Sequence, residues 1–438
     1  MIKTRAIKLG VSLAAVLGMA ACTAETGDPS DQDTSVDESA LKQWKRGAWE
    51  LKLATGPSQF SPLRTLLKSA EVVGIGESIH MTGTQHALRV DAMKYMIEHL
   101  NFRAIGIETG YLSSQPLTAY LAGEHDSLNH AMDAVHAVFT SVEDAEFYKW
   151  VKNWNQTHPT DRVSAFGFDV QDVGSVDSLR KQGKALGLAQ PPQFSSCFCS
   201  NVTSMYACSK TPDFEFVNSK TFVGPRYDSC IADIQKETTL LADAHVRAKK
   251  VEVRNSIEEA QLVLSALLAF TQELHTQVVD ESASNVFRDE GMAVIAMHRV
   301  KKLGKKAIFI AHNGHLDKAN VSIAQQYYNM NLPMFGGYFR QRFGSGYKTI
   351  GQFSFNAEIN WPGVTQPAPD NRPGSYDRML KETGKDYLLV NNADNALFGK
   401  SDSFFMEYTA TIKSTPSAHY DLAIYSETSV PMTYYGYP

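Results

Sequence analysis

Six ionisable side chains suited to acid–base chemistry follow four separate apolar segments of the sequence. They are Glu77, His80, Glu108, Asp169, His312 and His315. Each apolar segment is short and is bounded by glycine or polar residues, as is typical of a buried strand. In an open α/β sheet, ligands bind at the carboxyl ends of the strands. We therefore expect these side chains to gather at one edge of a single sheet.

Imidazoles next to carboxylates favour a hydrolase that activates water. A neutral imidazole can take a proton from water near pH 7, and a neighbouring carboxylate fixes its tautomer and stabilises the imidazolium. We interpret His80 as this base, with either Glu77 or Glu108 as its carboxylate partner. His312 and His315 could protonate the leaving group or bind the oxyanion.

Arg89 lies nine residues after His80, inside the helix expected to follow the first strand. An arginine near the strand ends could pair with Glu77 or Glu108 and change their ionisation, so we include it in the catalytic set. Eight further histidines are interpreted as ordinary surface or core residues. These are His86, His99, His130, His136, His245, His275, His298 and His419.

Three other chemistries fit the sequence less well. The histidines and carboxylates could bind zinc or iron, but no His-Glu-x-x-His motif occurs, so we expect no cofactor and keep a divalent metal as a possibility. Gly74-Ile75-Gly76 resembles a dinucleotide-binding turn, but Ile79 replaces its third glycine. Here the glycines would only let the chain turn sharply. A nucleophilic serine is disfavoured because Gly-x-Ser-x-Gly is missing.

Strands and helices alternate along the chain, which predicts an α/β fold with a mostly parallel sheet flanked by helices. Strands are expected from Val72 to Gly76 and at Arg103–Gly110, Arg162–Val170, Lys306–Asn313, Tyr347–Phe355, Asp386–Val390 and His419–Tyr425. Helices are expected at Leu41–Ala54, Pro62–Ser69, Thr84–Leu100, Gln115–Ala122, Leu128–Phe139, Val142–Thr157, Val176–Leu186, Ser284–Leu303, from about Asp317, and at Leu332–Phe343. One or two long helices are expected at 231–277.

The N-terminus has the pattern of a bacterial export signal. Residues 1–21 combine a basic start with an apolar stretch too short to span a membrane, and small residues precede Cys22 as in a lipobox. We expect cleavage there, lipidation of Cys22, an acidic stalk at 22–40 and a domain at 41–438. The predicted product is an exported lipoprotein, anchored to a membrane at the periplasm or cell surface.

Four cysteines cluster in or beside an insertion at 189–230 that lacks helical periodicity. They are Cys197, Cys199, Cys208 and Cys230. In an oxidising compartment an even number of cysteines favours disulfides over a zinc site, and three pairings are possible. Cys197 and Cys199 are too close in sequence to bond each other comfortably. We expect this disulfide-bearing insertion, with the helices of 231–277, to lie over the cleft.

The composition bounds the partners. The formal net charge is -5 and charged residues make up 20% of the chain, which indicates a soluble globular domain with no nucleic-acid partner. We expect contact with a membrane only through the N-terminal lipid.

In this order, the polar segments resemble those of the erythromycin esterase family. The matching segments are Gly76–His80, Arg89, Gly106–Glu108, Phe166–Asp169, Arg288–Ala293, Ala311–His315 and Gly374–Asp377. The resemblance spans about Val72 to Tyr425. It implies hydrolysis of a macrolide lactone without a covalent intermediate, with His80 activating water. Glu77, Arg89, Glu108, His312 and His315 fall on the family's other active-site positions.

The resemblance carries the reaction class further than the substrate. Ile79, the cysteine-bearing insertion and the export signal depart from the family's usual pattern. We expect a small ester or lactone as substrate and assign Asp169, Arg288 and Asp289 to its binding. A wider group of similar fold includes haem-binding lipoproteins, so the alternative is a metal- or haem-binding exported lipoprotein that uses the same histidines and glutamates.

Overall fold

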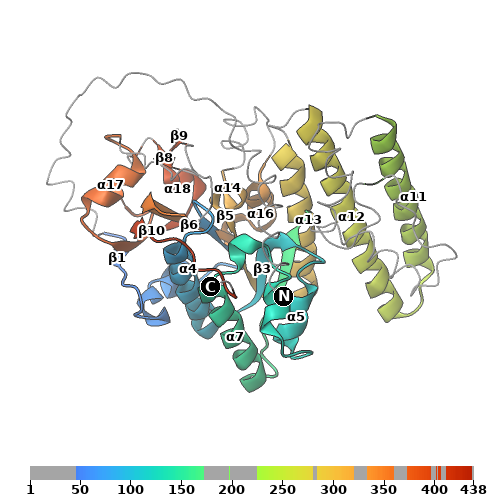
Figure 1. Cartoon of the computed structure of the whole chain (residues 1–438), viewed down its shortest axis with the longest axis horizontal. Helices are drawn as coiled ribbons and strands as arrows, with labels where there is room; N and C mark the ends of the chain where they lie inside the picture. The colour runs from blue at the N-terminus through green and yellow to red at the C-terminus, as the bar shows by residue number, and fades with distance from the viewer. Residues whose placement is uncertain are drawn as a thin grey trace, which may run out of the picture.

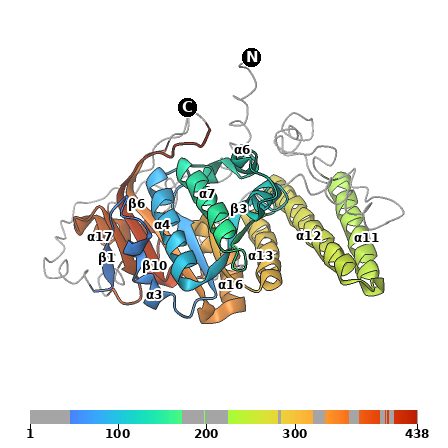
Figure 2. The same ribbon diagram turned by 90° about the horizontal axis from the view of Figure 1, so that it is seen from below.

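An eight-stranded sheet forms the centre of the part of the chain that the structure describes (Figures 1 and 2). This computed structural model describes residues 46–171, 197, 224–279, 284–319, 333–359, 372–395, 401, 403–405 and 411–436. The strands are β1 (Ala48–Glu50), β2 (Val72–Glu77), β3 (Phe102–Gly110), β4 (Ser164–Asp169), β5 (Lys306–His312), β6 (Tyr347–Ala357), β7 (Tyr387–Asn391) and β10 (Leu422–Ser429). The predicted α/β class is confirmed.

The sheet is mostly parallel. Its order is β1-β7-β10-β6-β2-β5-β3-β4, and every pairing from β10 to β4 is parallel. Only β7 pairs antiparallel with its neighbours β1 and β10 among these described strands. The short strands β8 (Phe404–Phe405) and β9 (Thr411–Ile412) form a separate antiparallel pair that the sequence did not reveal.

The strand register brings the polar residues together. Glu77 at the end of β2 is paired with His312 at the end of β5. On the other side, Gly110 of β3 is paired with Asp169 of β4. Because these central strands run parallel, their carboxyl ends meet at one edge of the sheet.

Helices cover both faces of the sheet (Figures 1 and 2). Val73 and Ile75 of β2 pack with α4 and α7, whereas Val72 belongs to a second core built with α12, α13 and α16. This alternation follows from the two-residue period of a strand. Every residue of β2 and β3 is buried, as expected for parallel strands covered on both sides.

The helices have these bounds: α3 Leu63–Leu66, α4 Gly83–Leu100, α5 Gln115–Ala122, α6 Leu128–Met132, α7 Val142–Thr157, α11 Pro225–Arg247, α12 Val251–Val279, α13 Ser284–Leu303, α14 Asn313–Leu316, α16 Phe335–Phe343, α17 Tyr376–Glu382 and α18 Pro416–His419. Short 3-10 turns are η3 Pro57–Phe60, η4 Ala137–Phe139 and η6 Gly344–Gly346. Among the described residues, no helix is both long and apolar enough to cross a membrane.

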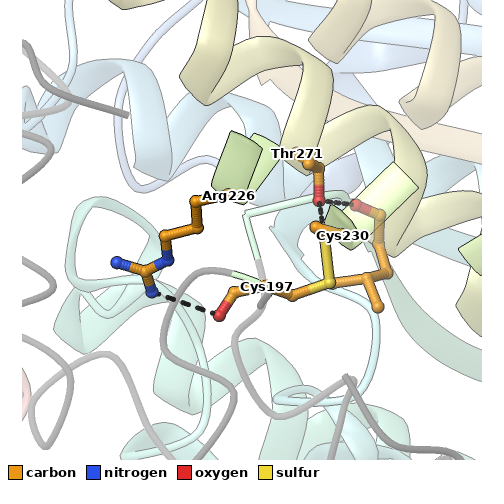
Figure 3. The surroundings of a disulfide bond; sticks show 5 residues. Cys197, Arg226, Cys230 and Thr271 are labelled. Carbon is orange, nitrogen blue, oxygen red and sulfur yellow. Dashed lines mark hydrogen bonds between the residues drawn. A yellow bond between two sulfur atoms is a disulfide. The ribbon is translucent and has the colours of Figure 1, made fainter. Parts of the chain in front are cut away.

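The long helices α11 and α12 extend away from the sheet at one end of the molecule (Figure 1). A disulfide joins Cys197 to Cys230 on α11, and the Cys230 sulfur lies 3.7 Å from Thr271 Oγ1 on α12 (Figure 3). This bond joins Cys197 to the helical portion. Cys199 and Cys208 lie outside the described residues, as do residues 1–45, which include Cys22 and the predicted stalk.

Several predicted elements differ in the structure. Within the predicted helix Leu41–Ala54, residues Ala48–Glu50 form an edge strand, because β7 offers them an antiparallel partner. The predicted helix Leu128–Phe139 breaks into α6 and η4. A short helix, Asn313–Leu316, follows β5 immediately, whereas Asp317–Ala319 are not helical and the rest of the helix expected from about Asp317 lies largely outside the described residues. The predicted helix Val176–Leu186 lies outside the described residues.

The glycines of β2 provide space rather than a turn. Gly74 and Gly76 lie inside the strand and neither has a positive φ angle, so their expected role in a sharp turn is wrong. A Cβ atom on Gly76 would lie 2.0 Å from Asn313 Oδ1. Asn313 in turn bonds to the Gln352 backbone, donating to its oxygen at 2.8 Å and accepting from its nitrogen at 3.2 Å.

Gly76→Ala should therefore lower the free energy of unfolding by about 1–3 kcal/mol, the usual cost of overpacking a tight core. Urea denaturation measures this change. Gly74→Ala is the matched control in the same strand. Its Cβ would come no closer than 3.0 Å to Tyr347 Oη and 3.1 Å to Leu316 Cδ2, so its cost should be smaller. Equal losses in the two variants would contradict this account.

Candidate active site

A buried carboxylate at the end of β2 holds three cationic or imidazole side chains. Glu77 is fully buried, and its Oε1 lies 2.5 Å from His80 Nδ1. Its Oε2 lies 3.1 Å from His86 Nε2 and 2.9 Å from Arg89 Nη1. Of the two carboxylates that the sequence left open, Glu77 is thus the direct partner of His80.

Glu77 is held in its ionised form. Burial alone raises the pKa of a carboxyl group, but the hydrogen bonds from His80 and His86 outweigh it and leave the pKa of Glu77 well below its usual range. A permanent negative charge therefore faces Nδ1 of His80. Such a charge stabilises the imidazolium that forms when the opposite nitrogen takes a proton.

A second carboxylate, Asp144, closes this network from behind. Arg89 Nη2 donates to Asp144 Oδ1 at 3.0 Å, and His86 Nδ1 lies 2.9 Å from Asp144 Oδ2. Asp144 is fixed by a capping box with Ser141 at the start of α7. The nearby charges of His86 and Arg89 overcome the effect of burial and lower the pKa of Asp144.

His86, interpreted from the sequence as an ordinary surface or core histidine, is part of this buried network. It is fully buried and bridges Glu77 and Asp144. His86 and Arg89 lie three residues apart on α4, so both point to the same side of the helix. That spacing was visible in the sequence. The Asp144 partner was not, because it comes from a helix 55 residues further on than Arg89.

A second cluster lies at the ends of β3 and β4. Glu108 Oε1 accepts from Arg288 Nη2 at 2.9 Å, and Glu108 Oε2 accepts from the backbone N–H of His312 at 2.8 Å. Asp169 accepts two hydrogen bonds from Arg288, one from Nε at 3.1 Å and one from Nη2 at 2.6 Å. Burial raises the pKa of Glu108, but His315 and Arg288 lower it well below its usual value.

His315 and His312 are held by protein groups on both ring nitrogens. His315 Nδ1 lies 2.9 Å from Asp289 Oδ2, and its Nε2 lies 3.3 Å from Glu108 Oε1. These charges outweigh burial and raise the pKa of His315 to about 10. His312 Nε2 lies 3.1 Å from Ser78 O, and its Nδ1 accepts from the N–H of Gly314 at 3.2 Å.

Contacts on both ring nitrogens suit His312 and His315 to a supporting role better than to proton transfer. The bonds of His312 require a neutral ring with its proton on Nε2. Asp289, assigned to substrate binding from the sequence, is fully buried, and its Oδ1 accepts from the backbone N–H of Phe335 at 2.6 Å. Asp289 thus positions His315. His80 is the more exposed imidazole, with 12% of its side chain accessible against 3% for His315.

One buried acid beside this cluster had no signal in the sequence. Glu273 of α12 accepts from Gln171 Nε2 at 2.5 Å through Oε1, while its Oε2 has no hydrogen-bond partner in the described structure. Burial raises the pKa of Glu273 to about 8. Across the described residues, no three His, Cys, Asp or Glu side chains are arranged to hold a metal ion.

Comparisons with known proteins identify the family of this chain. The family model described as erythromycin esterase matches residues 97–429. The chain belongs to the erythromycin esterase family. Glu108, Asp169, Arg288, His312 and His315 lie within the matched residues, whereas Glu77, His80 and Arg89 precede them.

Two curated proteins are similar in sequence to this chain. YbfO of Bacillus subtilis (strain 168), whose name describes it as a hydrolase, is 23% identical over 346 residues, which cover 75% of this chain and 76% of YbfO. Erythromycin esterase type I of Escherichia coli is 30% identical over 88 residues, or 19% of this chain and 22% of that enzyme. The erythromycin esterase family and these relatives support a hydrolase.

Solved structures share the fold. A Bacillus cereus protein has a TM-score of 0.73 at 17% identity, with 91% of this chain and 98% of that chain covered. A mutant of the erythromycin esterase EreC in its open conformation has a TM-score of 0.68 at 17% identity, with 87% and 98% covered. At this level of identity the likeness concerns the fold alone.

Replacing Asp144 by alanine should lower the free energy of unfolding by about 3–5 kcal/mol, because Arg89 would keep a buried charge with half its compensation. Chemical denaturation measures this loss. Since the pKa of Asp144 is depressed in the folded state, the loss should be full above about pH 4 and shrink below it. Asp126→Ala, which removes an exposed partner of Lys152, should change stability little. Similar losses in both variants would argue against the buried network.

Proposed function

We propose that this protein hydrolyses a carboxylic ester or lactone with a water molecule that His80 activates, without a covalent intermediate. The observation that supports this most directly is the 2.5 Å contact between Glu77 Oε1 and His80 Nδ1. This contact commits Nδ1 of His80 to the Glu77 carboxylate, which is buried and also bound by His86 and Arg89. Proton transfer to and from water then passes through Nε2.

The proposed reaction balances with the residues of this chain. Nε2 of His80 takes a proton from water while the water oxygen attacks the carbonyl carbon, and a tetrahedral oxyanion forms. When the oxyanion collapses, the bond to the leaving oxygen breaks and the imidazolium returns its proton to that oxygen. The products are a carboxylic acid and an alcohol, and His80 is neutral again.

Glu77 acts on the base through charge and orientation. Arg89 and His86 both bind its Oε2, so the carboxylate cannot rotate away from His80. A carboxylate in this position selects the tautomer with the proton on Nδ1 and lowers the free energy of the imidazolium. The ion pairs of Arg288 with Glu108 and with Asp169 would set the charge on the far side of the site.

His80→Ala should reduce kcat for ester hydrolysis by about 10²–10⁴-fold, because a positioned base contributes about that much. The assay is a panel of p-nitrophenyl esters, simple lactones and macrolide lactones, including erythromycin. The control is His99→Ala, which removes an exposed imidazole from the far end of α4, the helix that follows His80. Full activity of a folded His80→Ala protein would rule out this mechanism.

We also propose that the protein works outside the cytoplasm as a lipoprotein anchored through Cys22. The export pattern before Cys22 supports this, and the Cys197–Cys230 disulfide suits an oxidising compartment.

Cys22→Ala should therefore move the protein from the membrane fraction to the soluble fraction of expressing bacteria, because the thiol that accepts the lipid is lost. Immunoblots of separated fractions measure the change. Cys197→Ser should leave the protein with the membrane, since it removes a cysteine of the disulfide instead. Wild-type protein found only in the soluble fraction would overturn the anchor.

A further inference from the structure

The connection between α6 and α7 borders the candidate active site. The backbone N–H of His136 donates to Thr109 Oγ1 at 2.9 Å, one residue after Glu108 on β3. Three residues further on, the ring of Phe139 lies edge-on to His80 with 6.1 Å between ring centroids. These contacts place the segment from His136 to Phe139 against the ends of β2 and β3.

The charged groups of the site influence the pKa of the His136 side chain. These groups are Glu108 on β3, Asp169 on β4, Arg288 on α13 and His80 in the turn after β2. Burial lowers the pKa of His136, and His80 lowers it further against the opposing effect of the two carboxylates. The ring is therefore neutral near pH 7 and carries one N–H donor.

The other imidazoles of the site are already engaged. His86 lies between Glu77 and Asp144, His312 between Ser78 and Gly314, and His315 between Asp289 and Glu108. His80 is oriented by Glu77. The backbone of His136 donates to Thr109 Oγ1 and accepts from the N–H of Phe139 at 2.9 Å, and among the described residues no hydrogen bond of its ring is found.

The charged donor nearby, Arg288, is engaged through two of its three nitrogens. Arg288 directs Nε and Nη2 at Asp169 and Nη2 also at Glu108. The oxyanion formed by water attack needs a hydrogen-bond donor, and a fixed donor at this position commonly contributes a large part of catalysis. A neutral imidazole can fill this role and polarise a carbonyl without giving up its proton.

We propose that His136 is a further catalytic residue, whose ring N–H binds the carbonyl oxygen of the ester and the oxyanion that forms from it. This inference rests on the proposed ester hydrolysis. No proton leaves His136 during the reaction, because His80 takes the proton from water and returns it to the leaving oxygen. His136, interpreted as ordinary from the sequence, thereby gains a role opposite the base.

His136→Ala should lower kcat about 10²–10³-fold, the usual effect of losing one oxyanion donor, while KM changes much less. His136→Gln keeps an N–H donor and should recover part of this loss. His130→Ala is the matched control, since His130 is exposed on α6 six residues earlier. Circular dichroism and thermal melts of all variants check that they fold. Unchanged kcat in His136→Ala, or a loss confined to KM, would overturn the assignment.

A binding measurement separates this inference from the proposed function. Phenylboronic acid accepts hydroxide from water and becomes a tetrahedral anion that mimics the oxyanion, so its affinity reports the donor without turnover. His136→Ala should weaken its binding at least about tenfold, the effect of one good hydrogen bond of roughly 1.4 kcal/mol. Equal affinities, or no binding by the wild-type protein, would overturn the role of His136. Absence of ester hydrolysis by the wild-type protein would instead overturn the proposed function.

Discussion

The candidate site depends on one ionised carboxylate enclosed in the protein. Taking Glu77 out of water is unfavourable unless its charge is compensated, and His80, His86 and Arg89 together provide that compensation. The same contacts fix the direction of each partner. Asp144 then balances Arg89 and His86 and connects the end of β2 to the first turn of α7. Stability and orientation therefore come from the same set of bonds.

The sheet supplies the geometry that this network needs. The pairing of β2 with β5 sets Glu77 beside His312, and the pairing of β3 with β4 brings Asp169 to the end of β3. Arg288 then links Glu108 with Asp169 from α13. Two cores, one on each face, keep these strands rigid. The site is thus built on strand ends and supported by helices.

Much of this arrangement could be predicted from the sequence, because β2, β3 and β5 are continuous apolar runs that end in ionisable residues. The choice between Glu77 and Glu108 could not, since it depends on side-chain directions. Asp144 and Glu273 gave no signal, because each lies within a helix far along the chain from its partners. Ala48–Glu50 was predicted to be helical because its strand partner, β7, is more than 300 residues away.

Two buried groups with strongly raised pKa values, Glu273 and His315, affect the heat of folding. At pH 7 the native protein holds a proton on Glu273, with a pKa of about 8, and on His315, with a pKa of about 10. In the unfolded chain both groups return to ordinary values, so unfolding releases protons to the buffer. Native stability should then decline as the pH rises through the range from about 6.5 to 8, where both groups contribute. A calorimetric enthalpy of unfolding will include the buffer's own heat of protonation, and it will differ between phosphate and imidazole at the same pH.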